Sequence, residues 1–378
     1  MKNMYRKNLI ICFHPYSYMG GATIKMIQLL NGLNKRNFEI VYLYIKKNCK
    51  LNLDKNIKVI KINSSRTLFS FFKIKKILSI YDTKKFNKKI YISNQNYSNI
   101  LTFFLLKNFQ EYKSILIERN HLDELNYYES FNDFCKKNII KKLMKLTYKN
   151  ATIIIGNTKK LSKDLSNFIN SQVKTIYSPT NSKEVLKLSK SYIPSNIKKD
   201  KSRIRLLSVS RFTKRKDLIT LLKAFLVINS KFSNIDLILI GYGPELDNIN
   251  NFINENNLSK KIFVLPSKKN PFPYFLISDL YVMPSLYEGC PNSIIEAILL
   301  NLPVISSNCN TGPSEILLNG KGGFIFKKKD VFSLVNKIKL FVKNKEVFNE
   351  KLKIAKKNIY RFEEKNIIKQ YNDLLNII

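Results

Sequence analysis

The sequence predicts an α/β protein made of two doubly wound domains, each built on a parallel sheet. Short apolar runs rich in β-branched residues alternate with longer amphipathic segments over the whole chain, which is typical of parallel α/β sheets. The alternation forms two series separated by a polar stretch. The length of 378 residues suits two domains of roughly 100–200 residues each, and a hydrophobic content of 44% can supply two cores.

The first series of buried strands is expected at Leu9–Phe13, Ile40–Ile45, Val59–Ile62, Ile90–Ser93, Ser114–Glu118 and Ala151–Gly156. The second series is expected at Ile204–Ser208, Asp236–Ile240, Ile262–Leu265, Leu280–Met283 and Val304–Ser306. We place the first domain at 1–185, a linker at 186–202 and the second domain at 203–355. The linker holds a proline, serines and a charged cluster, with no apolar periodicity. A final helix at 356–378 is expected to pack back toward the first domain.

The chain is strongly basic, with 66 Lys and Arg against 27 Asp and Glu, a net charge of 66 − 27 = +39. Such a surplus attracts anions, so nucleic acid, anionic lipid and phosphate-bearing substrates all fit. An AT-rich coding sequence is the alternative, since it favours Lys, Asn, Ile, Phe and Tyr, and Trp is absent. No helix-turn-helix, RNA-binding signature or basic stripe is recognisable, so we expect no nucleic-acid partner.

The five cysteines form no close pair and only two histidines occur, so neither a disulfide framework nor a zinc site is expected. This usage favours a reduced, cytoplasmic compartment. The apolar run at 9–13 is too short for the core of a signal peptide, and no run approaches the roughly 20 residues that span a bilayer.

Two glycine-containing or cationic loops follow strands of the second series. Arg211 and Lys216 lie between a strand and a helix that begins near Leu218, where free N–H groups and the helix dipole favour an anion. A solvated basic loop is the alternative. Gly241 and Gly243 follow the next strand and would let the backbone approach a ligand closely, although a tight structural turn explains them as well.

A third loop carries two carboxylates. Glu288 is expected in a loop after a strand, and Glu296 about one turn into a helix that begins near Asn292. Both carboxylates could line one end of a ligand whose phosphates meet that helix N-terminus. The segment Gly312-Pro313-Ser314-Glu315-Ile316 follows as a turn and a helix start.

In this order the motifs resemble glycosyltransferase family 4, the retaining enzymes of the GT-B fold, over about 120 residues. The resemblance implies two Rossmann-like domains facing a cleft. The first would bind the acceptor and the second the nucleotide sugar. In the first half, Gly20-Gly21-Ala22 resembles the family's glycine loop, Asn157-Thr158 its serine position and His121 its active-site histidine, although a lone histidine in a loop is often a surface group.

The resemblance also implies residue roles. Arg211 and Lys216 would hold the donor pyrophosphate, and Glu296 the ribose hydroxyls. Glu288 would meet the transferred sugar. Together with His121, the residues Glu288, Lys216 and Arg211 form the expected catalytic set. The other expected donor-contacting residues are Gly20, Gly21, Gly241, Gly243, Gly289, Cys290, Pro291 and Asn292.

The chain departs from the family pattern at three points: Asp217 stands where a glycine is common, Cys290 replaces an aromatic residue, and Leu265-Pro266-Ser267 lacks a glycine. These departures bear on the identity of the donor. No Asp-x-Asp pair, the usual clamp for a metal-bound diphosphate, occurs. We therefore expect metal-independent transfer, no cofactor, and a nucleotide diphosphate sugar, by resemblance a UDP-sugar, as donor.

The resemblance favours enzymes that add hexoses or N-acetylhexosamines to glycan or polyprenyl-linked acceptors in surface polysaccharide, capsule or lipopolysaccharide synthesis. Leu68–Tyr81 and Lys136–Lys149 are basic and amphipathic, so an anionic membrane surface is a further expected partner, at the inner face of the cytoplasmic membrane. Packing of these helices on their own sheet is the alternative. A nucleotide-sugar 2-epimerase of the same fold, and a basic nucleic-acid-binding protein, are the competing functions.

Overall fold

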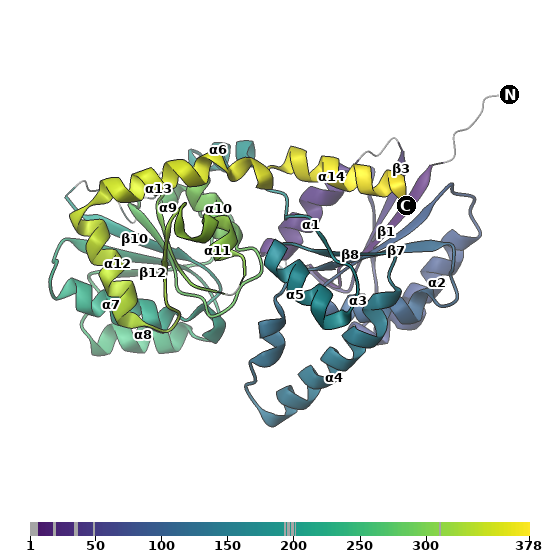
Figure 1. Cartoon of the computed structure of the whole chain (residues 1–378), viewed down its shortest axis with the longest axis horizontal. Helices are drawn as coiled ribbons and strands as arrows, with labels where there is room; N and C mark the ends of the chain where they lie inside the picture. Colours follow the sequence, from purple (N-terminus) through teal and green to yellow (C-terminus); the bar gives the residue numbers. More distant parts are fainter. Residues whose placement is uncertain are drawn as a thin grey trace. The chain divides into compact units, whose positions relative to one another are not determined.

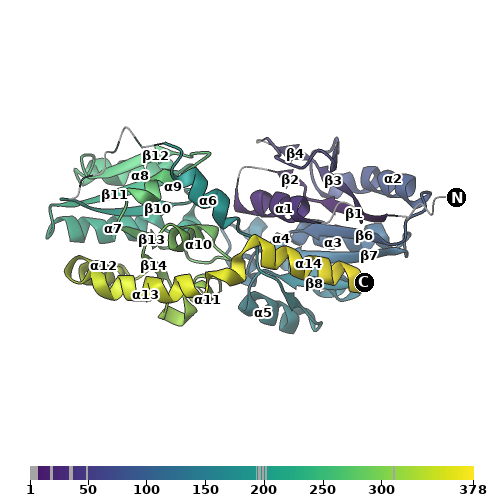
Figure 2. The same cartoon turned by 90° about the horizontal axis from the view of Figure 1, so that it is seen from above.

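The computed structural model describes residues 7–17, 20–33, 37–47, 50–192, 194, 197, 200, 202–309 and 311–378. The chain forms two compact units (Figures 1 and 2). Unit 1 comprises residues 1–180 and 364–378, and unit 2 comprises residues 181–363. Each unit holds a parallel sheet with helices on both faces, so the expected fold class is confirmed.

Unit 1 contains a seven-stranded sheet of order β5-β3-β1-β6-β7-β8-β9. Its strands are β1 (Asn8–Phe13), β3 (Phe38–Tyr44), β5 (Lys58–Lys61), β6 (Lys89–Asn94), β7 (Tyr112–Glu118), β8 (Ile153–Gly156) and β9 (Lys174–Thr175), and β2 (Tyr16–Ser17) pairs with β4 (Lys46–Lys47) beside it. Its helices are α1 (Gly21–Gly32), η1 (Leu68–Ser70), α2 (Phe71–Asp82), α3 (Asn96–Leu106), η2 (Leu122–Asn126), α4 (Phe131–Thr147), η3 (Tyr148–Asn150), α5 (Lys159–Ile169) and α14 (Glu364–Ile377).

Unit 2 contains a six-stranded sheet of order β12-β11-β10-β13-β14-β15. Its strands are β10 (Ile204–Val209), β11 (Ile235–Gly241), β12 (Ile262–Pro266), β13 (Leu280–Met283), β14 (Val304–Ser307) and β15 (Phe324–Phe326). Its helices are α6 (Ser182–Ser189), η4 (Lys214–Lys216), α7 (Leu218–Asn229), α8 (Leu246–Glu255), α9 (Phe272–Leu276), α10 (Asn292–Leu299), α11 (Pro313–Ile316), η5 (Leu318–Gly320), α12 (Val331–Lys343), α13 (Lys345–Lys357) and η6 (Ile359–Phe362).

Each expected strand is present within about two residues of its predicted bounds. The central strands are buried on both faces, which is why they appear in the sequence as continuous apolar runs. Side chains at Ile10 and Cys12 enter the core on one face of the first sheet, and Leu9, Ile11 and Phe13 enter the core on the other. The short edge strands β9 and β15 were not expected.

The domain boundary lies earlier than the sequence indicated. The chain divides between Thr180 and Asn181, and residues 182–189, which the sequence placed across the end of the first domain and the linker, form α6 of unit 2. Asn181 caps this helix by accepting a hydrogen bond from the backbone N–H of Glu184 at 3.0 Å. The helix is short and its apolar contacts are distant in sequence, which conceals it from periodicity.

The last helix belongs to unit 1. The sequence placed one helix at 356–378, whereas α13 ends at Lys357, η6 follows and α14 begins at Glu364. Helix α14 lies beside α1 (Figures 1 and 2) and buries a row of side chains in the core on that face of the sheet. These side chains are Ile367, Ile368, Tyr371, Leu374 and Leu375. Residues 364–378 therefore complete the first core, as expected for the end of the chain.

The described cysteines Cys12, Cys135, Cys290 and Cys309 are free. No helix within the described ranges combines the length and the hydropathy that a bilayer-spanning segment needs.

We predict that Leu375→Ala destabilises unit 1 by about 2–5 kcal/mol, because it leaves a cavity in a closed core. The side chain of Leu375 is 0% exposed. Ile377→Ala is the matched control on the same helix, since Ile377 is 79% exposed and should change stability by less than about 0.5 kcal/mol. Urea unfolding followed by circular dichroism measures both, and equal midpoints for the two variants would contradict the packing of α14.

Candidate functional site

The strand order of unit 2 places four polar loops at one edge of its sheet. Strand β10 lies between β11 and β13, so the winding of the chain reverses there. The loops after β10, β11, β13 and β14 leave the carboxyl ends of neighbouring parallel strands, which is where open α/β sheets bind ligands. The residues that the sequence predicted as donor contacts in this half of the chain lie on these loops or on α10, except Gly241, which is the last residue of β11.

An ion pair joins the first and third of these loops. The Nζ of Lys216, in η4, donates a hydrogen bond to Oε1 of Glu288 after β13, and both side chains are largely buried. Burial alone would raise the pKa of the Glu288 carboxyl, but the charges of Lys216 and Arg215 outweigh it and hold that pKa below its ordinary value. Glu288 is therefore ionised at neutral pH, and a cation lies beside it at the edge of the sheet.

Asp217 explains how the loop turns without the expected glycine. Its backbone is left-handed, with φ 48° and ψ 41°, a conformation that glycine adopts readily and that aspartate tolerates. The Oγ1 of Thr220 donates to its carboxylate at 2.8 Å, and the Thr220 N–H donates to its carbonyl at 3.1 Å. The turn that carries Lys216 into α7 is thus kept.

Gly241 and Gly243 pack against the loop that carries Arg211. A Cβ at Gly241 would lie 1.9 Å from the carbonyl oxygen of Ser210, and one at Gly243 would lie 2.1 Å from that of Phe212. The close approach that these glycines permit is therefore an approach to the chain's own backbone. Of the two interpretations of Gly241 and Gly243, a tight structural turn fits these contacts best. The guanidinium of Arg211 lies 5.5 Å from the ring centroid of Tyr242, between the two glycines.

The loop from Gly289 to Asn292 is held by the segment after β14. Thr311 Oγ1 donates to the carbonyl oxygen of Glu288. Gly312, at φ 51°, lies so close that a Cβ there would be 2.0 Å from the carbonyl oxygen of Gly289 and 2.7 Å from Pro291 Cδ. This contact explains the glycine of the Gly312-Pro313 motif and fixes the position of the Glu288 loop.

Helix α10 begins directly after this loop. Pro291 occupies its N-cap without a side-chain cap, and Asn292 Oδ1 is buried with no hydrogen-bond partner. Glu296 lies one turn into the helix and is partly buried. The pKa of the buried Tyr281 hydroxyl is raised, first by burial and then by the nearby carboxylates of Glu296 and Glu288. Both carboxylates and a helix N-terminus therefore meet at this end of β13, and such an N-terminus suits a phosphate.

Gly20 and Gly21 lie in unit 1, at the N-terminus of α1, the first long helix after β1. Strand β1 has β3 on one side and β6 on the other, so the winding of this sheet also reverses at its first strand. Gly20 precedes the helix and Gly21 is its first residue. A Cβ at Gly20 would meet no atom within 4 Å, so open space lies beside the N-terminus of α1.

His121 follows β7 in unit 1 and is buried between two carboxylates. Its Nε2 lies 2.9 Å from Asp164 Oδ2, and its Nδ1 lies 3.2 Å from Asp123 Oδ2. Burial lowers the pKa of His121, but Asp123 and Asp164 outweigh burial and raise it above the ordinary value. Asp164 lies on α5, which Thr158 caps by accepting from the N–H of Leu161 at 3.2 Å. His121 is therefore a fixed group rather than a free surface histidine.

The sequence did not predict a buried polar cluster that lies at the carboxyl edge of the sheet of unit 1. Asn94, at the end of β6, donates to His14 Nδ1 at 2.8 Å and accepts from Arg119 Nε at 2.8 Å. Arg119 also donates to Ser178 Oγ at 2.9 Å, and His14 Nε2 lies 3.1 Å from Thr23 Oγ1. Burial and the charge of Arg119 lower the pKa of His14 to about 3. The one feature of the sequence that could have indicated this cluster is that His14 and Arg119 follow strands and Asn94 ends one.

Within the described residues, no group of three or more His, Cys, Asp or Glu side chains is arranged to hold a metal ion.

Comparison with known proteins identifies relatives. Residues 189–362 match the family described as glycosyl transferases group 1. The chain is 37% identical over 214 residues, covering 54% of this chain and 50% of the relative, to an uncharacterized glycosyltransferase of Methanocaldococcus jannaschii. It is 24% identical over 218 residues, 58% of this chain and 57% of the relative, to the N-acetylgalactosamine-N,N'-diacetylbacillosaminyl-diphospho-undecaprenol 4-alpha-N-acetylgalactosaminyltransferase of Campylobacter jejuni. The chain thus spans about half the length of these relatives.

A solved structure shares the whole fold. HepE of Anabaena, in complex with UDP-glucose, superposes with a TM-score of 0.79 over 98% of this chain and 100% of that chain, at 16% identity. The expected GT-B architecture of two doubly wound domains is therefore confirmed.

We predict that the pKa values of the two histidines are shifted in opposite directions from the ordinary value of about 6.5. The pKa of His121 is raised and that of His14 is lowered. NMR titration of the ring resonances should give His121 a midpoint above this value, and His14 no titration above about pH 5. Since the folded pKa of His121 is raised, its stabilisation is present below about pH 6.5 and is lost as the pH rises through the folded value. Asp164→Asn should lower the His121 midpoint and leave His14 unchanged, whereas an unshifted His121 would argue against this geometry.

Proposed function

We propose that this chain, whose residues 189–362 match the glycosyl transferases group 1 family, transfers a hexose or N-acetylhexosamine from a nucleotide diphosphate sugar to a glycan acceptor. The observation that carries the proposal is the meeting of Lys216, the Glu288 loop and the N-terminus of α10 where the winding of the second sheet reverses. This edge combines a cation, a carboxylate and free helix N–H groups, which is the chemistry that a sugar diphosphate requires.

In this proposal, Lys216 and Arg211 hold the pyrophosphate. Cleavage of the sugar–phosphate bond leaves negative charge on the diphosphate, and a unit cation about 4 Å away stabilises that charge by roughly 4 kcal/mol at an effective dielectric constant of about 20, before desolvation. Lys216 is already paired with Glu288, so the diphosphate shares a cation that the carboxylate keeps in place. Fixed charges of this kind need no reorganisation during the reaction.

The remaining roles follow the family pattern. Glu296, one turn into α10, holds the ribose hydroxyls, and Glu288 meets the transferred sugar. The backbone of 289–292 lies along the donor sugar and phosphate. Gly20, Gly21 and His121 belong to the acceptor domain, where His121 is the expected active-site histidine.

Transfer is proposed to retain the anomeric configuration. The bond between the anomeric carbon and the phosphate oxygen breaks, and the acceptor oxygen bonds to that carbon on the same face. The acceptor proton passes to the leaving phosphate oxygen, so no covalent enzyme intermediate and no metal is required.

The acceptor is proposed to be a lipid-linked or surface glycan, used at the inner face of the cytoplasmic membrane. The C. jejuni relative is named for an undecaprenol diphosphate acceptor. The Anabaena structure holds UDP-glucose, which supports a UDP-sugar as donor. Neither the M. jannaschii relative nor the C. jejuni relative is named as an epimerase or a nucleic-acid-binding protein.

The function is tested by screening UDP-, GDP- and ADP-sugars for thermal stabilisation of the protein, followed by transfer assays with polyprenyl-linked glycans. The expected result is stabilisation by a UDP-sugar and a product whose anomeric configuration, measured by NMR, matches that of the donor. An inverted product would rule out the retaining mechanism. Epimerised sugar released without acceptor would favour the epimerase instead.

We predict that Lys216→Ala and Arg211→Ala each lower kcat/KM by roughly 10²–10³, because each removes one cation from the leaving diphosphate. Lys214→Ala is the matched control, since Lys214 is an exposed lysine in the same 3-10 turn. Steady-state kinetics with the identified donor measures all three. Full activity of both Lys216 and Arg211 variants would overturn the phosphate assignment.

We also predict that EDTA leaves the transfer rate unchanged. The fixed cations and the α10 N-terminus would supply the charge that a divalent ion supplies elsewhere. Assays in EDTA, with and without added Mn²⁺, measure this. A rate abolished by EDTA and restored by Mn²⁺ would show that a metal takes part.

A further inference from the structure

Exposed large apolar side chains gather on three consecutive helices of unit 1. They occur on η1 and α2, on α3, on α4, and at Tyr128, three residues before α4: Leu68, Phe69, Phe72, Ile80, Tyr97, Phe104, Tyr128, Phe131, Phe134, Ile139 and Leu146. Helix α3 contacts both α2 and α4, so these side chains belong to neighbouring elements. We call these exposed side chains, with the lysines on α2 and α4, the aromatic–lysine face.

Helix α4 has two apolar rows, and only one of them packs inside the unit. Ile140 and Met144 are buried in the core beneath the helix. This is the internal packing that we gave, from the sequence, as the alternative to membrane contact for Lys136–Lys149. A second row remains outside, because Phe131, Ile139 and Leu146 lie at helical spacing on the opposite side and are exposed. An ordinary core helix has a polar outer face, so the second row is unexplained by the fold.

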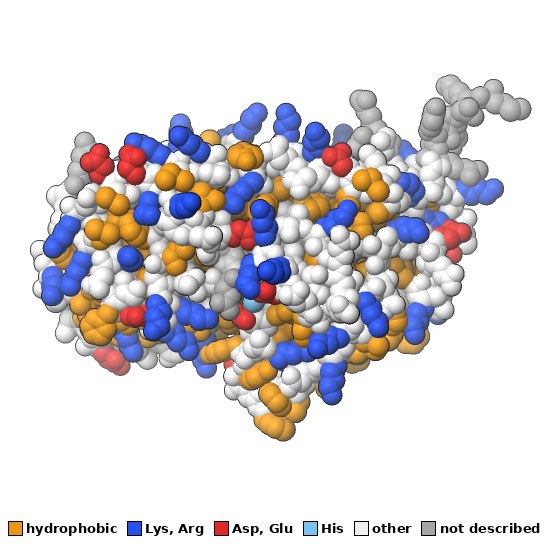
Figure 3. Space-filling model, in the orientation of Figure 1, with side chains coloured by type: hydrophobic (Ala, Val, Ile, Leu, Met, Phe, Trp, Pro, Cys, Tyr) orange, Lys and Arg blue, Asp and Glu red, His pale blue; other side chains and the backbone are white. Residues whose placement is uncertain are grey.

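The beginning of α4 carries an aromatic cluster. Phe131 and Phe134 stack with ring centroids 6.2 Å apart, and Tyr128 meets Phe134 edge-on at 5.0 Å. Phe131 is 78% exposed although it belongs to this cluster. Figure 3 shows hydrophobic side chains at the lower projecting end of unit 1, where α4 lies in Figure 1, with Lys and Arg side chains beside them.

The charge of these helices is almost entirely positive. Helices α2, α3 and α4 contain eight lysines and two aspartates, a net charge of 8 − 2 = +6. Both aspartates are already paired, Asp82 with Lys89 at 2.9 Å and Asp133 with Lys137 at 2.7 Å. The exposed Glu129, between Tyr128 and Phe131, adds one negative charge and makes the net charge 8 − 3 = +5, so the surface still presents mainly cations to an approaching partner.

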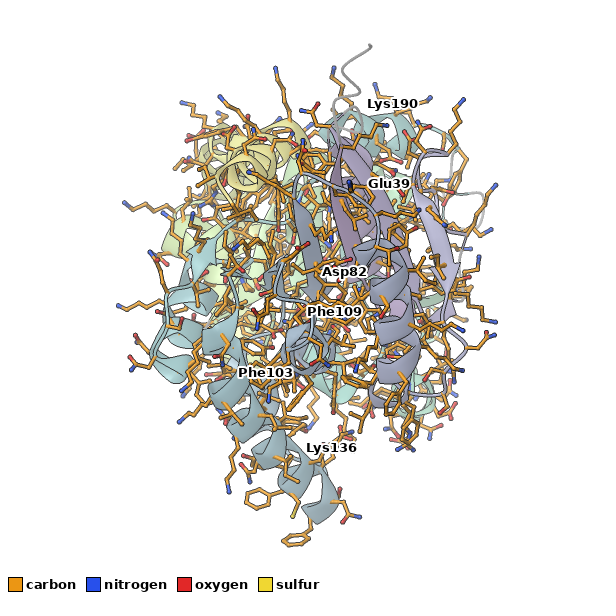
Figure 4. All side chains as sticks on the ribbon, turned by 90° about the vertical axis from the view of Figure 1, so that its right-hand side faces the viewer. Glu39, Asp82, Phe103, Phe109, Lys136 and Lys190 are labelled. Carbon is orange, nitrogen blue, oxygen red and sulfur yellow. The ribbon has the colours of Figure 1, made fainter. Side chains whose placement is uncertain are left out.

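Lysines and aromatic rings are interleaved across the helices. Lys136 of α4 lies 5.7 Å from the ring centroid of the exposed Tyr97 on α3. Lys107, just after α3, lies 5.0 Å from that of the half-buried Phe103 and 6.0 Å from that of the exposed Phe104. Figure 4 shows Lys136 near the projecting end of α4 and Phe103 on the same side of the unit. Lysines beside exposed aromatic rings suit a boundary between water, anionic headgroups and hydrocarbon.

We propose that the aromatic–lysine face binds the surface of an anionic phospholipid bilayer. Lysines attract anionic headgroups, with a contribution of about 1 kcal/mol for each cation near the surface. The exposed aromatic side chains then enter the boundary between headgroups and acyl chains. A nucleic acid would match the charge, but its phosphate backbone offers no apolar surface on which the aliphatic Leu68, Ile139 and Leu146 could be buried.

This inference deepens the proposed function and rests on its lipid-linked acceptor for its biological purpose. The binding itself is measured without any sugar transfer, so the two ideas fail separately. Loss of vesicle binding with intact transfer to a soluble glycan would overturn the bilayer face alone, and binding without transferase activity would overturn the proposed function alone.

The experiment is flotation of the full chain with vesicles of phosphatidylcholine alone or of phosphatidylcholine mixed with phosphatidylglycerol. The protein should float with the anionic vesicles and much less with the neutral ones, and added salt should release it. Phe131→Ser with Phe134→Ser, and separately Lys136→Glu with Lys142→Glu and Lys145→Glu, should each weaken binding to the anionic vesicles by about tenfold or more.

Matched controls lie in unit 2. Phe332→Ser changes an aromatic residue that is 75% exposed on α12, and Lys260→Glu with Lys269→Glu and Lys357→Glu makes the same change in net charge on exposed lysines. These controls should bind vesicles as the unchanged chain does. Circular dichroism verifies that each variant is folded. Equal losses in face and control variants, equal binding to neutral vesicles, or salt-sensitive binding to DNA in place of anionic vesicles would overturn the proposal.

Discussion

The buried ion pair between Lys216 and Glu288 is the contact around which the second unit's polar edge is organised. Breaking such a pair by removing one member costs about 3–5 kcal/mol, because the other charge stays buried alone. The neighbouring loops keep the two side chains of the pair in position. Asp217 turns the chain after Lys216, Thr311 fixes the Glu288 carbonyl, and Gly312 closes on the loop. The charge at this edge is therefore positioned before any ligand arrives.

Much of the architecture could be predicted because buried parallel strands leave a local signature. Runs such as Ile204–Val209 are apolar throughout, since both faces of the strand are covered. The boundary between the units left no such signature. Helix α6 packs on α9 and α10, which are distant in sequence, so residues 182–189 appeared to belong with the linker. Short edge strands such as Lys174–Thr175 contain too few residues for any pattern to register.

The candidate site was predictable to a different extent. The spacing of Glu288 and Glu296 indicated a loop followed by a helix, and the structure has that arrangement. The partners of these residues could not be inferred, because the Lys216 and Glu288 side chains meet across 72 residues of chain. The same holds for His121, whose partner Asp164 lies 43 residues later on another helix. A sequence pattern identifies candidate groups, but their pKa values depend on these long-range neighbours.

The discontinuous composition of unit 1 constrains how the protein can form during synthesis. Residues 181–363 are continuous, so the second core can close as soon as that stretch has left the ribosome. The core on the α1 face of the first sheet is still incomplete at that time, because Ile367, Tyr371 and Leu375 are made later, whereas the clusters on its other face need no residue of α14. Until α14 arrives, the apolar surface on α1 that it covers remains open to water and to chaperones.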